Sequence, residues 1–231
     1  MAKTSRFAAP RPYHHGNLAA ALIEAALALL DETQDWAFSL REVARRAGVS
    51  HNAPYKHFAE KRDLLAAVAA RGFDGLADLM SAALTDAADT PAGILACGRA
   101  YVRHGVQNPA LYRLMFGPAL TSAEAGRPIV EKEAGRRAKA IFAAALTAGV
   151  RSGALPPALA QPRQHAAAIL AVWSNLHGLT MMAIDDYVGP AADAERLVDP
   201  ILGALLAGIC AHPPALPQRI WVAPRLPAGS P

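Results

Sequence analysis

The sequence has few of the residues that disulfide scaffolds, metal modules and enzymes depend on. It contains two cysteines, Cys97 and Cys210, among 231 residues. That is too few for a disulfide framework or a multi-cysteine zinc module. No GxSxG, HExxH, GxGxxG or phosphate-loop pattern occurs, so an enzyme is not expected. We expect no metal, no cofactor and a reducing compartment, the cytoplasm.

Aromatic residues are scarce at 6%, whereas hydrophobic residues reach 53%. Alanine and leucine dominate and β-branched residues are sparse, which favours helices over sheets and predicts an all-α fold. Residues 1–16 are basic and lack the apolar core of a secretory signal. The apolar stretch 166–184 carries Ser174, Asn175 and His177. We therefore expect a buried helix there and not a membrane span.

The net charge of +4 is unevenly distributed along the chain. Residues 17–35 carry four acidic residues and no lysine or arginine. Residues 36–62 carry two acidic residues and six basic ones, namely Arg41, Arg45, Arg46, Lys56, Lys61 and Arg62. A basic window behind an acidic helix indicates a focused binding site for an anion such as the DNA backbone.

Two short helices are predicted inside this basic window. An amphipathic helix over 17–33 precedes them, with apolar residues at helical spacing. Ser39 and Glu42 have the spacing of a capping box, and Gly48 ends the short helix that it opens. Ser50 is placed to cap a second helix directly afterwards. A helix, a tight turn with glycine and a second helix predict a helix-turn-helix.

The second of these helices supplies the candidate DNA contacts. The first turns of such a helix meet base edges in the major groove, which predicts base contacts from Ser50, His51, Asn52 and Lys56. Phosphate contacts are expected from Tyr55, His57, Lys61 and Ser39. Pro54 leaves the register open, because it removes a helical hydrogen bond if Ser50 is the N-cap and removes none if the cap is one residue later.

The window resembles the TetR family of bacterial repressors over about residues 13–65. The matching positions are Ser39, Val43-Ala44, Ala47-Gly48-Val49-Ser50, Tyr55, His57-Phe58, Lys61 and Leu64-Leu65. Among these, Tyr55, His57 and Lys61 match positions at which the family contacts phosphates. The resemblance implies an all-helical homodimer that binds double-stranded DNA. Its N-terminal DNA-binding domain would be followed by a larger ligand-binding and dimerisation domain.

On this basis we divide the chain into four parts. They are a flexible basic arm (1–12), a DNA-binding domain (13–60), a helical ligand-binding and dimerisation domain (61–211) and a Pro-rich tail (212–231). The family dimerises chiefly through its last two long helices, expected here at 163–187 and 191–211. A long helix over 60–84 would join the two domains, and Gly72 and Gly75 could let it bend.

The C-terminal half carries a second, weaker resemblance. Trp173, His177 and Gly178 are similar to the signature of a TetR subgroup with a WHG-type domain, as is the opening Tyr13-His14-His15-Gly16-Asn17-Leu18. We interpret His14 and His15 as part of a DNA-facing arm and not as metal ligands, because adjacent histidines do not share a helix face.

Trp173 and His177 share one helix face because they are four residues apart. Core packing is the favoured interpretation, and the wall of a ligand pocket is the alternative. The candidate ligand residues are Tyr101, His104, Tyr112, Met115, Phe116, Phe142, Trp173, His177 and Met181.

The sequence therefore predicts a DNA-binding transcriptional regulator, namely a repressor that an unknown small-molecule inducer releases from a palindromic operator. One alternative is a helical small-molecule-binding protein without DNA-binding function. Another is a constitutive regulator whose C-terminal half only dimerises. Phosphate neutralisation makes DNA binding steeply salt-dependent, which separates a DNA-binding protein from a small-molecule carrier.

Overall fold

The structure is a computed structural model that describes residues 18–85, 87, 89–120 and 129–217, with only the backbone described for 129–132. The basic arm, the His14-His15 pair and the end of the Pro-rich tail lie outside the described residues.

The described residues form an all-helical protein, as expected, and they contain no strand. The α-helices are α1 (Leu18–Thr33), α2 (Leu40–Arg46), α3 (Lys61–Thr85), α4 (Thr90–Gln107), α5 (Pro109–Phe116), α6 (Ile129–Ser152), α7 (Pro162–Ile184) and α8 (Val198–Ala211). The 3₁₀ helices are η1 (Pro54–Lys56), η2 (Pro118–Leu120), η3 (Pro157–Ala160) and η4 (Ala191–Leu197).

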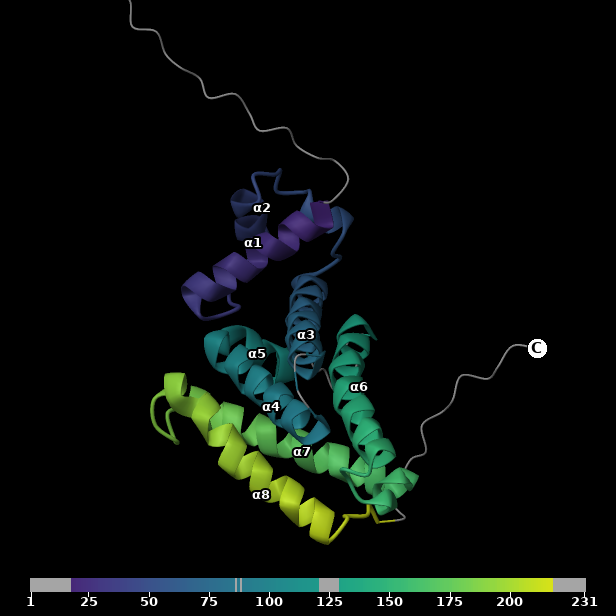
Figure 1. Ribbon diagram of the computed structural model, residues 1–231. Coiled ribbons are helices and arrows are strands. Elements are labelled where there is room, and N and C mark those ends of the chain that lie inside the picture. Colours follow the sequence, from purple (N-terminus) through teal and green to yellow (C-terminus); the bar gives the residue numbers. More distant parts are fainter. Residues whose placement is uncertain (1–17, 86, 88, 121–128, 218–231) are drawn as a thin grey trace, which may run out of the picture.

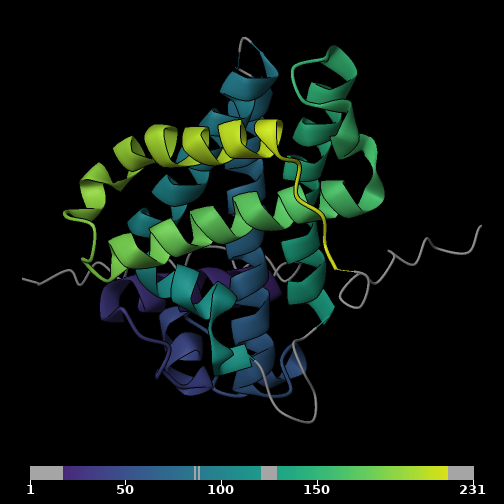
Figure 2. The ribbon, with the colours of Figure 1, turned by 90° about the horizontal axis from the view of Figure 1, so that it is seen from below.

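The helices form a small unit and a larger one, which α3 connects (Figure 1). Helices α1 and α2 pack together at one end, and α3 runs from them into the larger group, where it packs on α4, α5 and α6. Helices α7 and α8 lie side by side as the outermost layer at the opposite end (Figures 1 and 2). One continuous hydrophobic core runs through both units.

Helix α2 forms as the sequence predicts, with defined caps at both ends. The Ser39 hydroxyl accepts a hydrogen bond from the Glu42 N–H, and the Glu42 carboxylate accepts one from the Ser39 N–H. At the other end Gly48 has φ +69°. Its N–H donates to the Arg45 carbonyl, and the Val49 N–H donates to the Ala44 carbonyl. These paired bonds form a Schellman motif, which requires a left-handed residue at the position of Gly48.

The prediction of an α-helix after Ser50 was wrong. Residues 51–57 form turns and one short 3₁₀ helix, η1. Pro54 explains the difference, because it occupies the first position of η1, where its missing N–H costs nothing. The Ala53 N–H donates to the Ser50 carbonyl instead. Neither register left open by the sequence is therefore the observed one.

The predicted helix at 191–211 is divided into two. Residues 191–197 form the 3₁₀ helix η4, and α8 begins at Val198. Pro200 is then the third residue of α8, within the first turn, where no intrahelical donor is needed. A continuous α-helix from 191 would place the same proline in its interior and lose a hydrogen bond.

Gly72 lets α5 approach α3 closely. A Cβ atom at this position would lie 2.6 Å from the Met115 Sδ atom and 3.1 Å from Leu111 Cγ. A side chain here would collide with α5, so packing gives this glycine a role whether or not α3 bends.

Among the described helices, α7 is the one that is long and apolar enough to cross a membrane by length and composition alone. Its side chains Ala168, Val172 and Leu176 are buried within the protein. Leu170 and Met182 are 51% and 47% exposed, so α7 carries apolar groups that the described part of the chain leaves uncovered.

Candidate nucleic-acid interface and ligand site

The segment between α2 and α3 presents a row of polar side chains. The exposed residues are Ser50, His51, Asn52, Tyr55, Lys56 and His57. Ala53, Pro54 and Phe58 are buried beneath them and anchor the segment to the core. Tyr55 is 53% exposed, an unusual position for a large aromatic ring. This short segment therefore offers hydroxyl, imidazole, amide and ammonium groups from one anchored surface.

Two further predicted contacts, Ser39 and Lys61, already have partners inside the protein. The Ser39 hydroxyl donates to the Glu42 carboxylate while it accepts the Glu42 N–H. Lys61 is half-buried, and its ammonium lies 5.4 Å from the centre of the Phe38 ring. Ser39 is exposed but its hydroxyl is engaged by Glu42, whereas Lys61 is less exposed than Lys56.

The basic window is partly neutralised by α1. Both guanidinium nitrogens of Arg46 donate to the Glu32 carboxylate. The hydrogen bonds from Arg46 lower the pKa of Glu32, and Glu32 raises the pKa of Arg46. Arg41 and Lys56 form no ion pair with any residue that the structure describes. The positive charge available to an anion is thus smaller than the residue count suggests.

Five of the nine predicted ligand residues form one aromatic cluster in the larger unit. Tyr101, Tyr112, Phe116, Trp173 and His177 contact one another through tilted, edge-to-face and stacked rings 4.7–6.0 Å apart. The Tyr101 and Tyr112 hydroxyls lie 2.8 Å apart, and the Tyr112 hydroxyl lies 2.7 Å from His177 Nδ1. The cluster joins α4, α5 and α7.

Burial sets the protonation states of this hydrogen-bonded chain. It raises the pKa of both tyrosines and lowers the pKa of His177, so all three groups are neutral at physiological pH. The two contacts fit either direction of donation along the chain. Where Tyr112 donates to His177 Nδ1, the neutral imidazole carries its proton on Nε2.

Three of the predicted ligand residues take no part in these ring contacts. Met115 and Phe142 are fully buried, and Met115 packs on Gly72. His104 is 7% exposed, and burial lowers its pKa. Its Nε2 atom is buried with no hydrogen-bond partner among the described groups.

A cavity of about 280 Å³ lies where the two units meet. Its lining comes from the α1–α2 connection, from the end of α5 and from α7 and consists of Trp36, Arg113, Phe116, Gly117, Pro118, His177 and Met181. The sequence predicts Phe116, His177 and Met181 as ligand residues but not Trp36. Trp36 was missed because no helical spacing in the sequence connects it with α7. Trp36 brings the DNA-binding end of the chain to the wall of this cavity.

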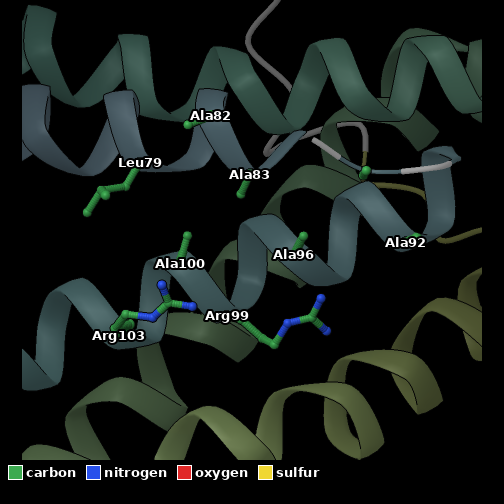
Figure 3. Close-up of a pocket in the computed structure, with 9 residues that line it drawn as sticks. Leu79, Ala82, Ala83, Ala92, Ala96, Arg99, Ala100 and Arg103 are labelled. Atoms are coloured by element: carbon green, nitrogen blue, oxygen red, sulfur yellow. The ribbon is translucent and has the colours of Figure 1, made fainter. Parts of the chain in front are cut away.

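A second hollow of about 420 Å³ lies between α3 and α4 (Figure 3). Alanines form most of its wall, and Leu79 lies at one side. Arg99 and Arg103 line its edge and are paired with Asp199 and Glu195. These two ion pairs connect α4 to η4 and α8.

Two family models match the chain in the order of its two units. The model described as "Bacterial regulatory proteins, tetR family" matches residues 22–68, and the model described as "Tetracyclin repressor-like, C-terminal domain" matches residues 94–205. The chain belongs to the TetR family. It is therefore a DNA-binding transcriptional regulator with a helical C-terminal ligand-binding domain.

Solved structures share this TetR fold over nearly their whole length. A protein of unknown function from Rhodococcus sp. RHA1 is 27% identical with a TM-score of 0.69, and the match covers 85% of this chain and 100% of that one. The fatty acid degradation regulator FadR from Bacillus halodurans is 18% identical with a TM-score of 0.67, covering 85% and 98%. FadR from Bacillus subtilis, in complex with stearoyl-CoA, is 17% identical with a TM-score of 0.66, covering 82% and 98%. No curated protein matches the sequence significantly.

Proposed function

We propose that this TetR-family regulator is a homodimeric repressor that a small-molecule inducer releases from a palindromic operator. The observation that carries the proposal is the polar row at residues 50–57, anchored by buried apolar residues in the matched DNA-binding region. The four-part division of the chain (1–12, 13–60, 61–211 and 212–231) is kept as part of this proposal.

The polar row divides into base-reading and phosphate-binding groups. Asn52 and Lys56 carry the amide and ammonium groups that discriminate adenine and guanine in the major groove. Tyr55 and His57 hold phosphates and set the position of the row, assisted by Ser39 and Lys61 at its border. Ser50 and His51 complete the base-facing surface. A 3₁₀ turn in place of a longer helix makes this reading surface short.

The dimer is proposed to form through α7 and α8. Leu170 and Met182 on α7 and Ile201 on α8 are large, apolar and exposed. A Cβ atom at Gly178, Gly203 or Gly208 would meet nothing within 4 Å, so these helices can approach another surface closely. Two-fold symmetry would place two recognition segments in successive major grooves, roughly 34–36 Å apart, on a palindrome.

An inducer acts by binding the DNA-incompetent state more tightly than the DNA-bound state. The similar FadR structure with stearoyl-CoA supports a small-molecule ligand for the C-terminal helices. In this chain the aromatic cluster around His177 combines apolar walls with a few polar atoms, as small-molecule sites do.

The test is a selection of DNA fragments, random and genomic, at near-physiological salt, followed by affinity measurements on the enriched sequence. An enriched palindrome bound by a dimer supports the proposal. Asn52→Ala should change the sequence preference, whereas Tyr55→Phe should weaken all sequences alike. A folded dimer that enriches nothing, with no salt-dependent DNA binding, would instead favour a small-molecule-binding protein without DNA function.

A further inference from the structure

The cavity at the junction of the two units is lined by side chains from both of them. Trp36 belongs to the connection between α1 and α2, whereas His177 and Met181 belong to α7. Trp36 is half-buried against the common core, so its position depends on what packs beside it. A molecule in this cavity would contact the DNA-binding unit directly.

We propose that this junction cavity binds a small, uncharged aromatic compound with one hydrogen-bond acceptor, and that the compound controls DNA binding by fixing Trp36. The regulatory half of this statement rests on the proposed function, and the binding half does not.

The size and lining of the cavity define the ligand class. At about 280 Å³ it falls at the lower edge of the range for drug-sized molecules, so one ring or two fused rings fit. Trp36 and Phe116 offer aromatic faces, and Met181 offers a polarisable thioether that packs well on ring edges. The cation in the lining, Arg113, is bonded to the Asp185 carboxylate, so the cavity holds no uncompensated positive charge for an anionic ligand.

His177 supplies the polar group that orients the ligand. Its Nδ1 atom is held by the Tyr112 hydroxyl, and Tyr112 is in turn held by Tyr101. This chain fixes the ring, and with Tyr112 as the donor to Nδ1 it leaves Nε2–H as the donor that His177 offers to the ligand. A carbonyl oxygen on the ligand is the matching acceptor, and its bond completes a chain that begins in the core at Tyr101.

The part of the cavity wall that comes from the end of α5 leads to a second contact between the units. Phe116, Gly117 and Pro118 lead into η2, where the Leu120 carbonyl accepts a hydrogen bond from Arg62 at 2.9 Å. Arg62 lies at the start of α3, directly after the recognition segment. A ligand that shifts this wall therefore moves Leu120, a partner of Arg62, as well as Trp36.

The binding half can be tested with 1-indanone, an uncharged fused bicycle with one carbonyl. The full chain is labelled with 5-fluorotryptophan, and its three tryptophan signals are assigned by single tryptophan-to-phenylalanine variants. We expect a saturable ¹⁹F shift of the Trp36 signal. Indane, which has the same rings and no carbonyl, should bind more weakly, and His177→Phe should abolish that difference. The absence of a Trp36 shift at millimolar 1-indanone would overturn the proposal.

Two adjacent methionines provide matched variants. Met181 lines the cavity, whereas Met182 is 47% exposed and does not. Met181→Ala should weaken 1-indanone binding by about tenfold, and Met182→Ala should leave it unchanged at a protein concentration that keeps both variants in one oligomeric state. Equal effects of the two substitutions would place the ligand elsewhere.

The regulatory half of the proposal is tested by the thermodynamic linkage between 1-indanone binding and operator binding. If 1-indanone weakens binding to the selected operator, the operator must weaken 1-indanone binding by the same factor. A saturable Trp36 shift with an unchanged operator affinity would refute control through this cavity. Failure to select any operator would count against the proposed function, and the ¹⁹F result would stand independently of it.

Discussion

Replacing Tyr112 with phenylalanine tests the hydrogen-bonded chain that joins α4, α5 and α7. The substitution keeps the ring and its contacts and removes one oxygen. That oxygen is hydrogen-bonded to the Tyr101 hydroxyl at 2.8 Å and to His177 Nδ1 at 2.7 Å. Two polar groups therefore lose a partner at once, and Tyr101 is completely buried.

The magnitude follows from these two losses. A buried polar group left without a partner costs about 1–3 kcal/mol. His177 is half-buried and can regain a water, so we place the total cost of Tyr112→Phe at about 2–4 kcal/mol. Tyr101→Phe should cost only about 1 kcal/mol, because Tyr112 keeps its bond to His177. The assay is chemical denaturation at one fixed protein concentration, since an oligomer's stability depends on concentration.

The double variant, Tyr101→Phe with Tyr112→Phe, tests the chain most directly, because Tyr101→Phe should change stability in opposite directions in the two backgrounds. Tyr101→Phe should destabilise the natural protein but stabilise Tyr112→Phe, because in that background it removes an orphaned hydroxyl. Such a reversal is the coupling expected of residues that are in contact or share one hydrogen-bond network. If Tyr101→Phe costs the same in both backgrounds, the chain of hydrogen bonds does not exist and the reasoning fails.

Other predictions concern charge, backbone and pH. Glu32→Gln should release Arg46, tighten DNA binding and steepen the salt dependence of DNA binding. The control Glu24→Gln breaks the ion pair with Arg71 and should have neither effect. Equal salt dependence of DNA binding in the two variants would refute a role for Arg46. Gly48→Ala should destabilise the protein by about 1–2 kcal/mol in thermal unfolding, because Gly48 has φ +69°, which is unfavourable for alanine. A Cβ atom there would meet nothing within 4 Å, so the cost comes from the backbone and not from a collision. Unchanged stability would contradict the Schellman motif. Burial lowers the pKa of His104 below 6.5, so the unfolded state binds more protons than the folded state below about that pH. The stability of the protein should therefore fall as the pH drops below about 6.5. His104→Leu should flatten this fall, and an unaltered pH profile of stability would exclude His104 as its cause.

The elements that the sequence predicted correctly are those set by local chemistry. The capping box of Ser39 and Glu42 and the stop at Gly48 each depend on residues within one turn, and both are present in the structure. These signals need no tertiary information.

The differences arise where a proline competes with a helical pattern. The residues around Pro54 and Pro200 read as continuous helices by periodicity and polarity. In both places the chain starts its helix later, so that the proline falls in the first turn. A rule that shifts the helix start toward a proline would have found both boundaries.

The candidate ligand residues were only partly predictable, since the fold and not the sequence brings them together. The pairing of Trp173 and His177 follows from helical spacing. Their contact with Tyr112 and the arrival of Trp36 beside His177 depend on how separate helices cross. His177 is hydrogen-bonded at Nδ1 within the core while its ring lines a cavity, so core packing is observed and ligand binding stays a prediction.

The arrangement of the two units limits how a ligand signal can reach DNA. Beyond the continuous α3, the described residues of the DNA-binding unit contact the larger unit at α1 with α5, at Trp36 and at Arg62 with Leu120. A bend of α3 at Gly72 or Gly75 would have to break these contacts, and the space beside Gly72 is occupied by the Met115 side chain. Each of these contacts involves α5 or the segment directly after it, and the Trp36 cavity also involves α7. A small displacement of α5 would therefore reach these contacts, which makes α5 a more direct route to the recognition segment than a hinge within α3.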